Sequence, residues 1–252
     1  MLEHDKIYNQ DCFTASTQLP DQSVDVVITD PPYPNRMHLF PETLVDGLAM
    51  LYVACKKTKK YVVFFWNPFD VPTPPPGWHE VARHVWHKPD TKSITHYEVI
   101  VVWSREPKQR VSRVWSIPIL DYRSLRDWKP HPTQKPVRLI RYLLEQYTNE
   151  EDLVFDPFVG SGTTAVACKW MKRHFIGVEI DPKYAQIAQE RLTTRTWKKP
   201  EGAAPEHSLP EQLEDGIELS HEPLTEDSDN SPDESLPRTV ARKRPARKKK
   251  GK

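Results

Sequence analysis

Four residues near the amino terminus, Asp30-Pro31-Pro32-Tyr33, combine groups that could bind an amino group on an aromatic ring. They directly follow the apolar run VDVVIT, which predicts a buried strand. Two prolines hold the backbone rigid and lack N–H donors, so the carbonyls at this strand end stay available as acceptors. The Asp30 carboxylate and the Pro31 carbonyl could accept the amine hydrogens while Tyr33 stacks on the ring, which would act by positioning and electrostatics. The simpler alternative is a proline-rich turn whose aspartate caps a neighbour.

A second candidate site is the glycine-rich segment FDPFVGSGTT, residues 155–164, between an expected strand and an expected helix. Gly160 and Gly162 allow a tight turn and a close approach to a ligand. The start of the following helix offers free N–H groups to an anion. Glu179 stands about 20 residues beyond the turn, at the end of the next strand, where a carboxylate can accept hydrogen bonds from two ribose hydroxyls.

Three kinds of ligand compete for this turn. A phosphate loop needs a lysine after its last glycine, and none follows Gly162. A dinucleotide loop needs a third glycine, where this chain has Ala165 or its neighbours. An adenosyl amino acid, which has a ribose and a carboxylate but no phosphate, fits better. A plain glycine-rich turn with no ligand is the remaining alternative.

The surrounding pattern predicts alternating strands and helices. The expected strands are 24–29, 61–66, 97–103, 152–155 and 174–179, and the expected helices are 137–146, 163–172 and 182–192. The last helix has Pro182 at its first position and Asp181 as its cap. Such alternation predicts an α/β fold with a mostly parallel sheet, in which ligands bind beyond the carboxyl ends of the strands. Both candidate sites lie at such ends.

Composition divides the chain near Trp197. Residues 1–197 predict one folded domain, and residues 198–252 predict a disordered tail that is first acidic and then basic. The basic end could bind phosphates or serve only solubility. Cys12, Cys55 and Cys168 form no metal or disulfide spacing, the N-terminus lacks a signal-peptide core, and no apolar run approaches the ~18 residues of a membrane span. We therefore expect a cytoplasmic protein with no metal and no membrane partner.

Together and in this order, the motifs resemble the DNA amino-methyltransferases. The closest resemblance is to the permuted, or beta-class, group, in which the catalytic motif precedes the cofactor loop. It covers most of residues 7–192 and rests on Asp11-Cys12, VDVVITDPPY, VWHKPD with THYEVIVVWSRE, HPTQKP at 131–136, and FDPFVGSGTTAVA with HFIGVEID. It implies a Rossmann-like S-adenosylmethionine-dependent methyltransferase fold, α/β, with a sheet of about seven strands, one of them antiparallel. Residues 7–9 would form a further strand of that sheet.

The resemblance also implies roles for individual residues. The tetrapeptide Asp30, Pro31, Pro32 and Tyr33 would be catalytic, with no metal. The cofactor S-adenosylmethionine would be bound by Asp11, Asp30, Thr133, Gln134, Lys135, Asp156, Phe158, Gly160, Gly162, Thr163, Thr164 and Glu179.

The implied reaction is methyl transfer to the N6 amine of adenine in DNA after the base is flipped out. Enzymes for the N4 amine of cytosine use the same geometry and often have Ser at the first tetrapeptide position, so Asp30 favours adenine. An inactive nucleic-acid-binding protein is a further alternative. RNA and protein methyltransferases with related tetrapeptides usually place the cofactor loop first and have Asn as the first residue of the tetrapeptide.

DNA is the expected partner, and a small recognition region at about 105–130 interleaves cations with aromatic residues. Segments 34–43 and 71–77 are further candidates for contact with DNA, and an ordinary solvated loop is the simpler interpretation of the region. A cognate restriction endonuclease is an open question, as is the choice between monomer and homodimer. The candidate DNA-binding residues are Arg105, Lys108, Arg110, Arg113, Arg123 and Arg126.

Overall fold

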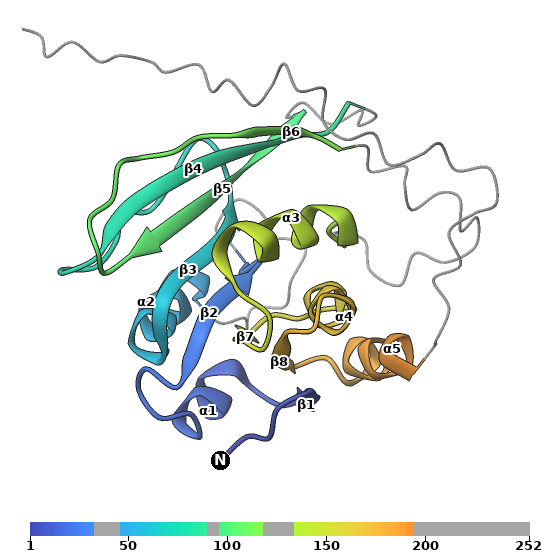
Figure 1. Cartoon of the computed structure of the whole chain (residues 1–252). Coiled ribbons are helices and arrows are strands. Elements are labelled where there is room, and N and C mark those ends of the chain that lie inside the picture. Colours follow the sequence, from blue (N-terminus) through green and yellow to red (C-terminus); the bar gives the residue numbers. More distant parts are fainter. Residues whose placement is uncertain (33–45, 90–95, 118–133, 194–252) are drawn as a thin grey trace, which may run out of the picture. The chain divides into compact units, whose positions relative to one another are not determined.

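The computed structural model describes residues 1–32, 46–89, 96–117 and 134–193 (Figure 1). Its eight strands are β1 (Lys6–Asn9), β2 (Val24–Thr29), β3 (Thr58–Trp66), β4 (His79–His87), β5 (Tyr97–Ser104), β6 (Val114–Ser116), β7 (Leu153–Asp156) and β8 (His174–Glu179). They form one sheet in the order β1-β8-β7-β2-β3-β5-β4-β6. Strand β5 is antiparallel to both of its neighbours, and the other described pairs are parallel.

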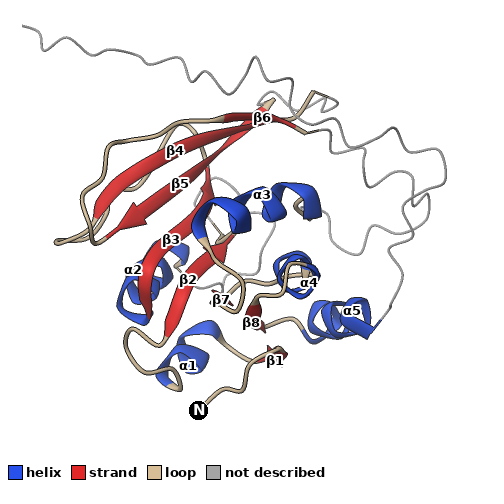
Figure 2. Ribbon diagram, viewed as in Figure 1, coloured by secondary structure: helices blue, strands red, loops and turns tan. Residues whose placement is uncertain are grey.

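Five helices accompany the sheet: α1 (Cys12–Thr17), α2 (Gly47–Lys57), α3 (Val137–Tyr147), α4 (Thr163–Trp170) and α5 (Pro182–Thr193). Figure 2 shows them together with the strands. Helix α1 contacts α2 and β8, and α2 contacts β3. Helix α3 contacts α4, α4 also contacts α5 and β8, and α5 also contacts β1 and β8. On β2, Val26 and Ile28 join the core cluster under α3 to α5, and Val27 joins the cluster under α1 and α2. Strands β2, β3 and β5 each contain an apolar run, because both of their faces are covered.

The structure confirms the predicted α/β class, the mostly parallel sheet and the single antiparallel strand. The sheet has eight strands, whereas about seven were expected. Strand β4, HEVARHVWH, mixes histidine and arginine with apolar residues and so lacks an apolar run. Strand β6 has only three residues and forms by pairing with β4 at the sheet edge. Neither strand has a signal in the sequence alone.

The predicted helices are present with small changes at their ends. Helix α4 ends at Trp170, two residues early, because Lys172 adopts the left-handed conformation with φ of 57°. Helix α5 is capped as expected, since the Lys183 N–H donates to Asp181 Oδ1 at 2.8 Å. Helix α2 was not predicted; Asp46 caps it by accepting from the Leu48 N–H at 3.0 Å. Across the stretches that the structure describes, no helix combines the length and apolarity needed to cross a membrane.

Candidate active site

The two candidate motifs lie next to each other at one edge of the sheet. Strands β2 and β7 are parallel neighbours, with Val27 opposite Phe155. Asp30 follows the end of β2, and Asp156 is the last residue of β7. The Thr29 hydroxyl donates to Asp156 Oδ1 at 2.8 Å and joins the two strand ends directly. The sequence separates the motifs by more than a hundred residues, and the sheet brings them together.

The glycine-rich turn has the backbone that the sequence predicted. Gly160 and Gly162 have φ values of 53° and 87°, in the left-handed region that favours glycine. Helix α4 then begins without a side-chain cap, so the N–H groups of its first turn are available to an anion. Thr163 and Thr164 are buried at this helix start.

Glu179 holds the turn from the neighbouring strand end. Its Oε2 accepts the Gly160 N–H at 3.0 Å, and its Oε1 accepts the Asp181 N–H at 2.9 Å. Burial raises the pKa of Glu179 above its usual range, and these backbone donors oppose that shift. Asn9, at the end of β1, donates to the Glu179 and Ile180 carbonyls at 2.9 Å each. Four adjacent strand ends thus form one continuous edge.

Three further predicted cofactor residues lie at this edge. Asp11 follows β1 and caps α1 by accepting from the Thr14 N–H at 2.8 Å. The Phe158 N–H donates to Asp156 Oδ1 at 3.1 Å, inside the turn. Gln134 Oε1 accepts from the Ser161 hydroxyl at 2.8 Å, which brings the HPTQKP segment to the turn. Tyr33 and Thr133 lie outside the described residues.

Lys135 was predicted to contact the cofactor, and the structure places it in an ion network beside Asp30. Its Nζ contacts Asp30 Oδ2 and lies 3.1 Å from Glu98 Oε2. Glu98 Oε1 in turn lies 3.0 Å from the Nζ of Lys88. The side chains of Lys88, Glu98 and Lys135 are each less than a tenth exposed. From the sequence, no role was assigned to Lys88, which lies in the VWHKPD motif, or to Glu98, which lies in THYEVIVVWSRE.

Gly47 and Arg191 were also missed. Gly47 is the first residue of α2, and a Cβ built on it would lie 2.1 Å from the Pro32 carbonyl oxygen and 3.1 Å from Pro31 Cβ. The only signal in the sequence is a glycine directly after a capping aspartate. Arg191, on α5, donates from Nη1 to the Ser161 carbonyl at 2.6 Å and so fixes the turn from outside.

Asp156 is buried, and desolvation raises its pKa from 3.8 to about 6, although hydrogen bonds from Thr164 and Thr29 oppose the shift. Because the pKa is higher in the folded state, this group stabilises the fold fully below pH 4, and that contribution is lost as pH rises to about 6. We therefore expect Asp156→Asn to gain stability relative to wild type over this interval, by up to about 3 kcal/mol. Denaturant unfolding at several pH values measures the difference, with the exposed Asp70→Asn as control. A pH-independent difference would contradict the assignment.

The DNA-binding candidates that the structure describes lie away from Asp30. Arg105 donates to the Cys55 carbonyl at 2.9 Å and lies over the Trp78 ring. Lys108 contacts Tyr61, and Arg110 pairs with Glu80, both at the edge where β3 and β4 begin. Arg113 is exposed beside the outer strand β6. Arg123 and Arg126 lie outside the described residues, as does segment 34–43.

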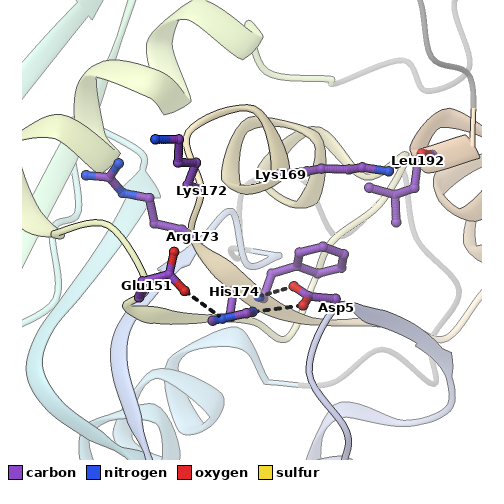
Figure 3. A pocket seen from close by; sticks show the side chains of 8 residues that line it. Asp5, Glu151, Lys169, Lys172, Arg173, His174 and Leu192 are labelled. Carbon is purple, nitrogen blue, oxygen red and sulfur yellow. Dashed lines mark hydrogen bonds and ion pairs between the residues drawn. The ribbon is translucent and has the colours of Figure 1, made fainter.

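A pocket of about 310 Å³ lies at the opposite edge of the sheet, where β1, β7 and β8 begin (Figure 3). His174 stands in it between two carboxylates, with Nδ1 2.8 Å from Asp5 and Nε2 3.3 Å from Glu151. Lys172 pairs with Glu150 at 3.3 Å. This pocket contains none of the predicted site residues, so the candidate active site is the edge formed by Asp30, the turn and Glu179.

Comparison with known proteins shows the family to which this chain belongs. The family model described as DNA methylase, of the N6/N4 type, matches residues 48–190. YubD of Escherichia coli (strain K12), a methylase by name, is 30% identical in an alignment of 223 residues that covers 77% of this chain and 92% of YubD. The type II methyltransferase M2.DpnII of Streptococcus pneumoniae is 34% identical over 116 residues, which is 45% of this chain and 42% of that protein.

Solved structures agree with this result. The complex of M1.HpyAVI with SAM matches with a TM-score of 0.53 at 25% identity, covering 75% of this chain and 98% of that one. The cytosine-N4-specific PvuII DNA methyltransferase gives a TM-score of 0.55 at 18% identity over 76% of this chain and 87% of that one, which shows a shared fold. The chain therefore belongs to the N6/N4 family of DNA methyltransferases.

Proposed function

We propose that this protein transfers a methyl group from S-adenosylmethionine to the N6 amine of adenine in DNA. The observation that carries the proposal is the junction of β2 and β7, where the Thr29–Asp156 hydrogen bond holds Asp30 beside the glycine-rich turn. An amine acceptor and a turn suited to an adenosyl amino acid thus share one edge, as in-line transfer between two bound molecules requires.

The residues at this edge fit S-adenosylmethionine. The uncapped start of α4 suits its carboxylate, and Glu179 suits its ribose hydroxyls. Ile180, the next residue, is 53% exposed and offers an apolar surface for an adenine ring beside Asp11. The SAM complexes of M1.HpyAVI and of TTHA0409 from Thermus thermophilus have the same fold. When bound, the cofactor supplies a methyl group on a positively charged sulfur.

Asp30 and the proline carbonyls provide what the amine needs. An exocyclic amine is a poor nucleophile because its lone pair is delocalised into the ring. Hydrogen bonds to the Asp30 carboxylate and the Pro31 carbonyl favour the pyramidal amine and direct its lone pair at the methyl carbon. Transfer would form the nitrogen–carbon bond as the carbon–sulfur bond breaks with its electron pair left on sulfur, and the proton that the methylated amine loses would pass to water. Tyr33 is proposed to stack on the flipped base.

Adenine is preferred over cytosine because Asp, not Ser, begins the tetrapeptide. The same acceptors would serve the N4 amine of cytosine, which is the second candidate. Mass spectrometry of nucleosides from unmethylated DNA treated with the protein and S-adenosylmethionine distinguishes the two. We expect N6-methyladenine. N4-methylcytosine would keep the mechanism and change the base, and no product despite DNA binding would indicate an inactive binding protein.

Two described residues flank the proposed recognition segment in the sequence. The Ile117 N–H donates to the His87 carbonyl at 3.1 Å after the end of β4, and Gln134 lies beside the turn. Arg123 and Arg126 lie between these residues in the sequence, and we propose that they contact DNA, with Arg113 before them. The type II names of relatives suggest action on bacterial DNA in the cytoplasm, with or without a cognate endonuclease.

Gly162→Ala is expected to weaken binding of S-adenosylmethionine about tenfold. Alanine is strained at φ of 87°, and its Cβ would lie 2.9 Å from Ala188 Cβ and 3.0 Å from Ala188 Cα. Equilibrium binding of labelled cofactor measures the effect. Gly77→Ala is a matched control, since Gly77 has φ of 78° with nothing within 4 Å of its Cβ. Ala188→Gly should restore part of the affinity, and an unchanged affinity in Gly162→Ala would contradict the assignment of the turn.

A further inference from the structure

The ion network beside Asp30 is built from four separate parts of the fold. Asp30 follows β2, Lys88 follows β4, Glu98 lies on β5, and Lys135 precedes α3. Glu98 stands between the two lysines, at 3.0 Å from Lys88 Nζ and 3.1 Å from Lys135 Nζ, and Lys135 reaches on to Asp30 Oδ2. Two ammonium groups and two carboxylates therefore alternate from the carboxyl end of β4 to that of β2, with balanced charge.

Aromatic side chains surround the two lysines. The Nζ of Lys135 lies 4.8 Å from the Phe65 ring centre and 6.0 Å from that of Trp86, and the Nζ of Lys88 lies 5.4 Å from Trp86. Such rings attract cations and exclude water, so the ammonium groups are held in place. In this setting a buried ammonium or carboxylate group without its ion partner costs free energy, so the position of each group depends on its neighbour in the network.

We infer that Glu98, supported by Lys88, is a positioning residue that holds Lys135 so that its ammonium group orients the Asp30 carboxylate and keeps it ionised for the target amine. This inference rests on the proposed function. It differs from a role in cofactor binding, because Lys135 contacts carboxylates and aromatic rings carried on, or next to, β2, β3, β4 and β5.

Charge placement around Asp30 predicts a pH dependence. Among the residues that the structure describes, the charged groups near Asp30 include Lys135, Glu98 behind it, and the buried Asp156 on β7. Removing the Lys135 ammonium leaves two carboxylates near Asp30, which favours the protonated form of Asp30. A protonated carboxyl lacks the negative charge with which the carboxylate accepts the amine hydrogen. The acidic side of the pH–rate profile should therefore move to higher pH when the lysine charge is lost.

The test compares kcat on DNA, the Kd of labelled S-adenosylmethionine without DNA, and the pH profile of kcat for several variants. Lys135→Met should lower kcat about a hundredfold and move the acidic side of the profile up by at least about one pH unit. Lys135→Arg should keep the wild-type profile, and Glu98→Gln should lower kcat about tenfold. In all three, the Kd of the cofactor should stay within about twofold of wild type.

Two further variants test whether the loss of kcat comes from removing any lysine charge or from leaving a buried charge unpaired. Lys59→Met removes a lysine that pairs with Asp25 at 3.0 Å at the other end of the sheet, and it should leave kcat and the profile unchanged. The double variant Lys88→Met with Glu98→Gln removes one charge of each sign, so it should fold and still lose kcat. Unchanged kcat in folded Lys135→Met or Glu98→Gln, or a cofactor Kd that rises in these variants as kcat falls, would overturn the inference. If the wild-type protein methylates no DNA, the proposed function fails, and this inference fails with it.

Discussion

Asp30→Asn should lower the rate of methyl transfer to DNA about a thousandfold while leaving the affinity for S-adenosylmethionine unchanged. Asparagine keeps the shape of the side chain and one oxygen acceptor, but it removes the negative charge and presents an amide NH₂ that competes with the target amine. The turn and Glu179 keep their own hydrogen bonds, because Asp30 makes none of them. A loss in kcat alone is the signature of an interaction made in the transition state.

Single-turnover transfer of labelled methyl groups to DNA measures this prediction, with cofactor binding measured in parallel. Asp21→Asn is a suitable control, since Asp21 is an exposed aspartate before the opposite end of the same strand and pairs with Lys57 at 2.8 Å. It should behave as wild type. Transfer by Asp30→Asn at a rate near that of wild type would remove Asp30 from the reaction.

Gly47→Ala should lower the rate of methyl transfer about a hundredfold, although Gly47 is not part of either motif. The added Cβ would lie 2.1 Å from the Pro32 carbonyl oxygen, and the nearest atoms belong to the rigid backbone and ring of two prolines. Helix α2 and the tetrapeptide must therefore move apart, which displaces the amine acceptors. Alanine is otherwise the better helix former, so loss of the helix is not the expected cause.

The measurement is again single-turnover transfer, with melting temperature and cofactor binding recorded beside it. Cofactor affinity should stay close to wild type, because the turn on β7 contacts α4 and β8 and not Gly47. Gly77→Ala, whose added Cβ has nothing within 4 Å, should leave the cofactor affinity at the wild-type value. Full activity in Gly47→Ala would show that the tetrapeptide tolerates displacement and that its position is not set by α2.

Much of this site could be predicted from the sequence because its parts are local. The apolar run before Asp30 predicts β2, and the glycines of the turn need left-handed backbone, which the structure has at Gly160 and Gly162. Glu179 lies where a strand end was expected and holds the turn. Parallel strands place such ends together, and the structure does bring the two candidate motifs side by side.

The remaining parts depend on contacts between distant residues, which periodicity does not encode. Lys135 was predicted to contact the cofactor from its motif, yet its partners, Asp30 and Glu98, are 105 and 37 positions away in the chain. Gly47 matters because of what packs on it, and no residue pattern indicates that contact. Arg105 was predicted from a run of cations and stays a predicted DNA contact; its side chain packs on Trp78 at the end of the sheet where β3 begins. The position of a residue along the chain did not show at which end of the sheet strands its side chain would lie.

The central claim is that cofactor and target amine meet at the edge formed by β1, β8, β7 and β2. A crystal structure of the protein with S-adenosylmethionine tests it most directly. The account predicts the carboxylate of the cofactor at the start of α4, its ribose hydroxyls on Glu179, and its methyl group facing Asp30. A cofactor bound at the opposite edge, in the pocket around His174, or bound at this edge with its methyl group away from Asp30, would contradict it.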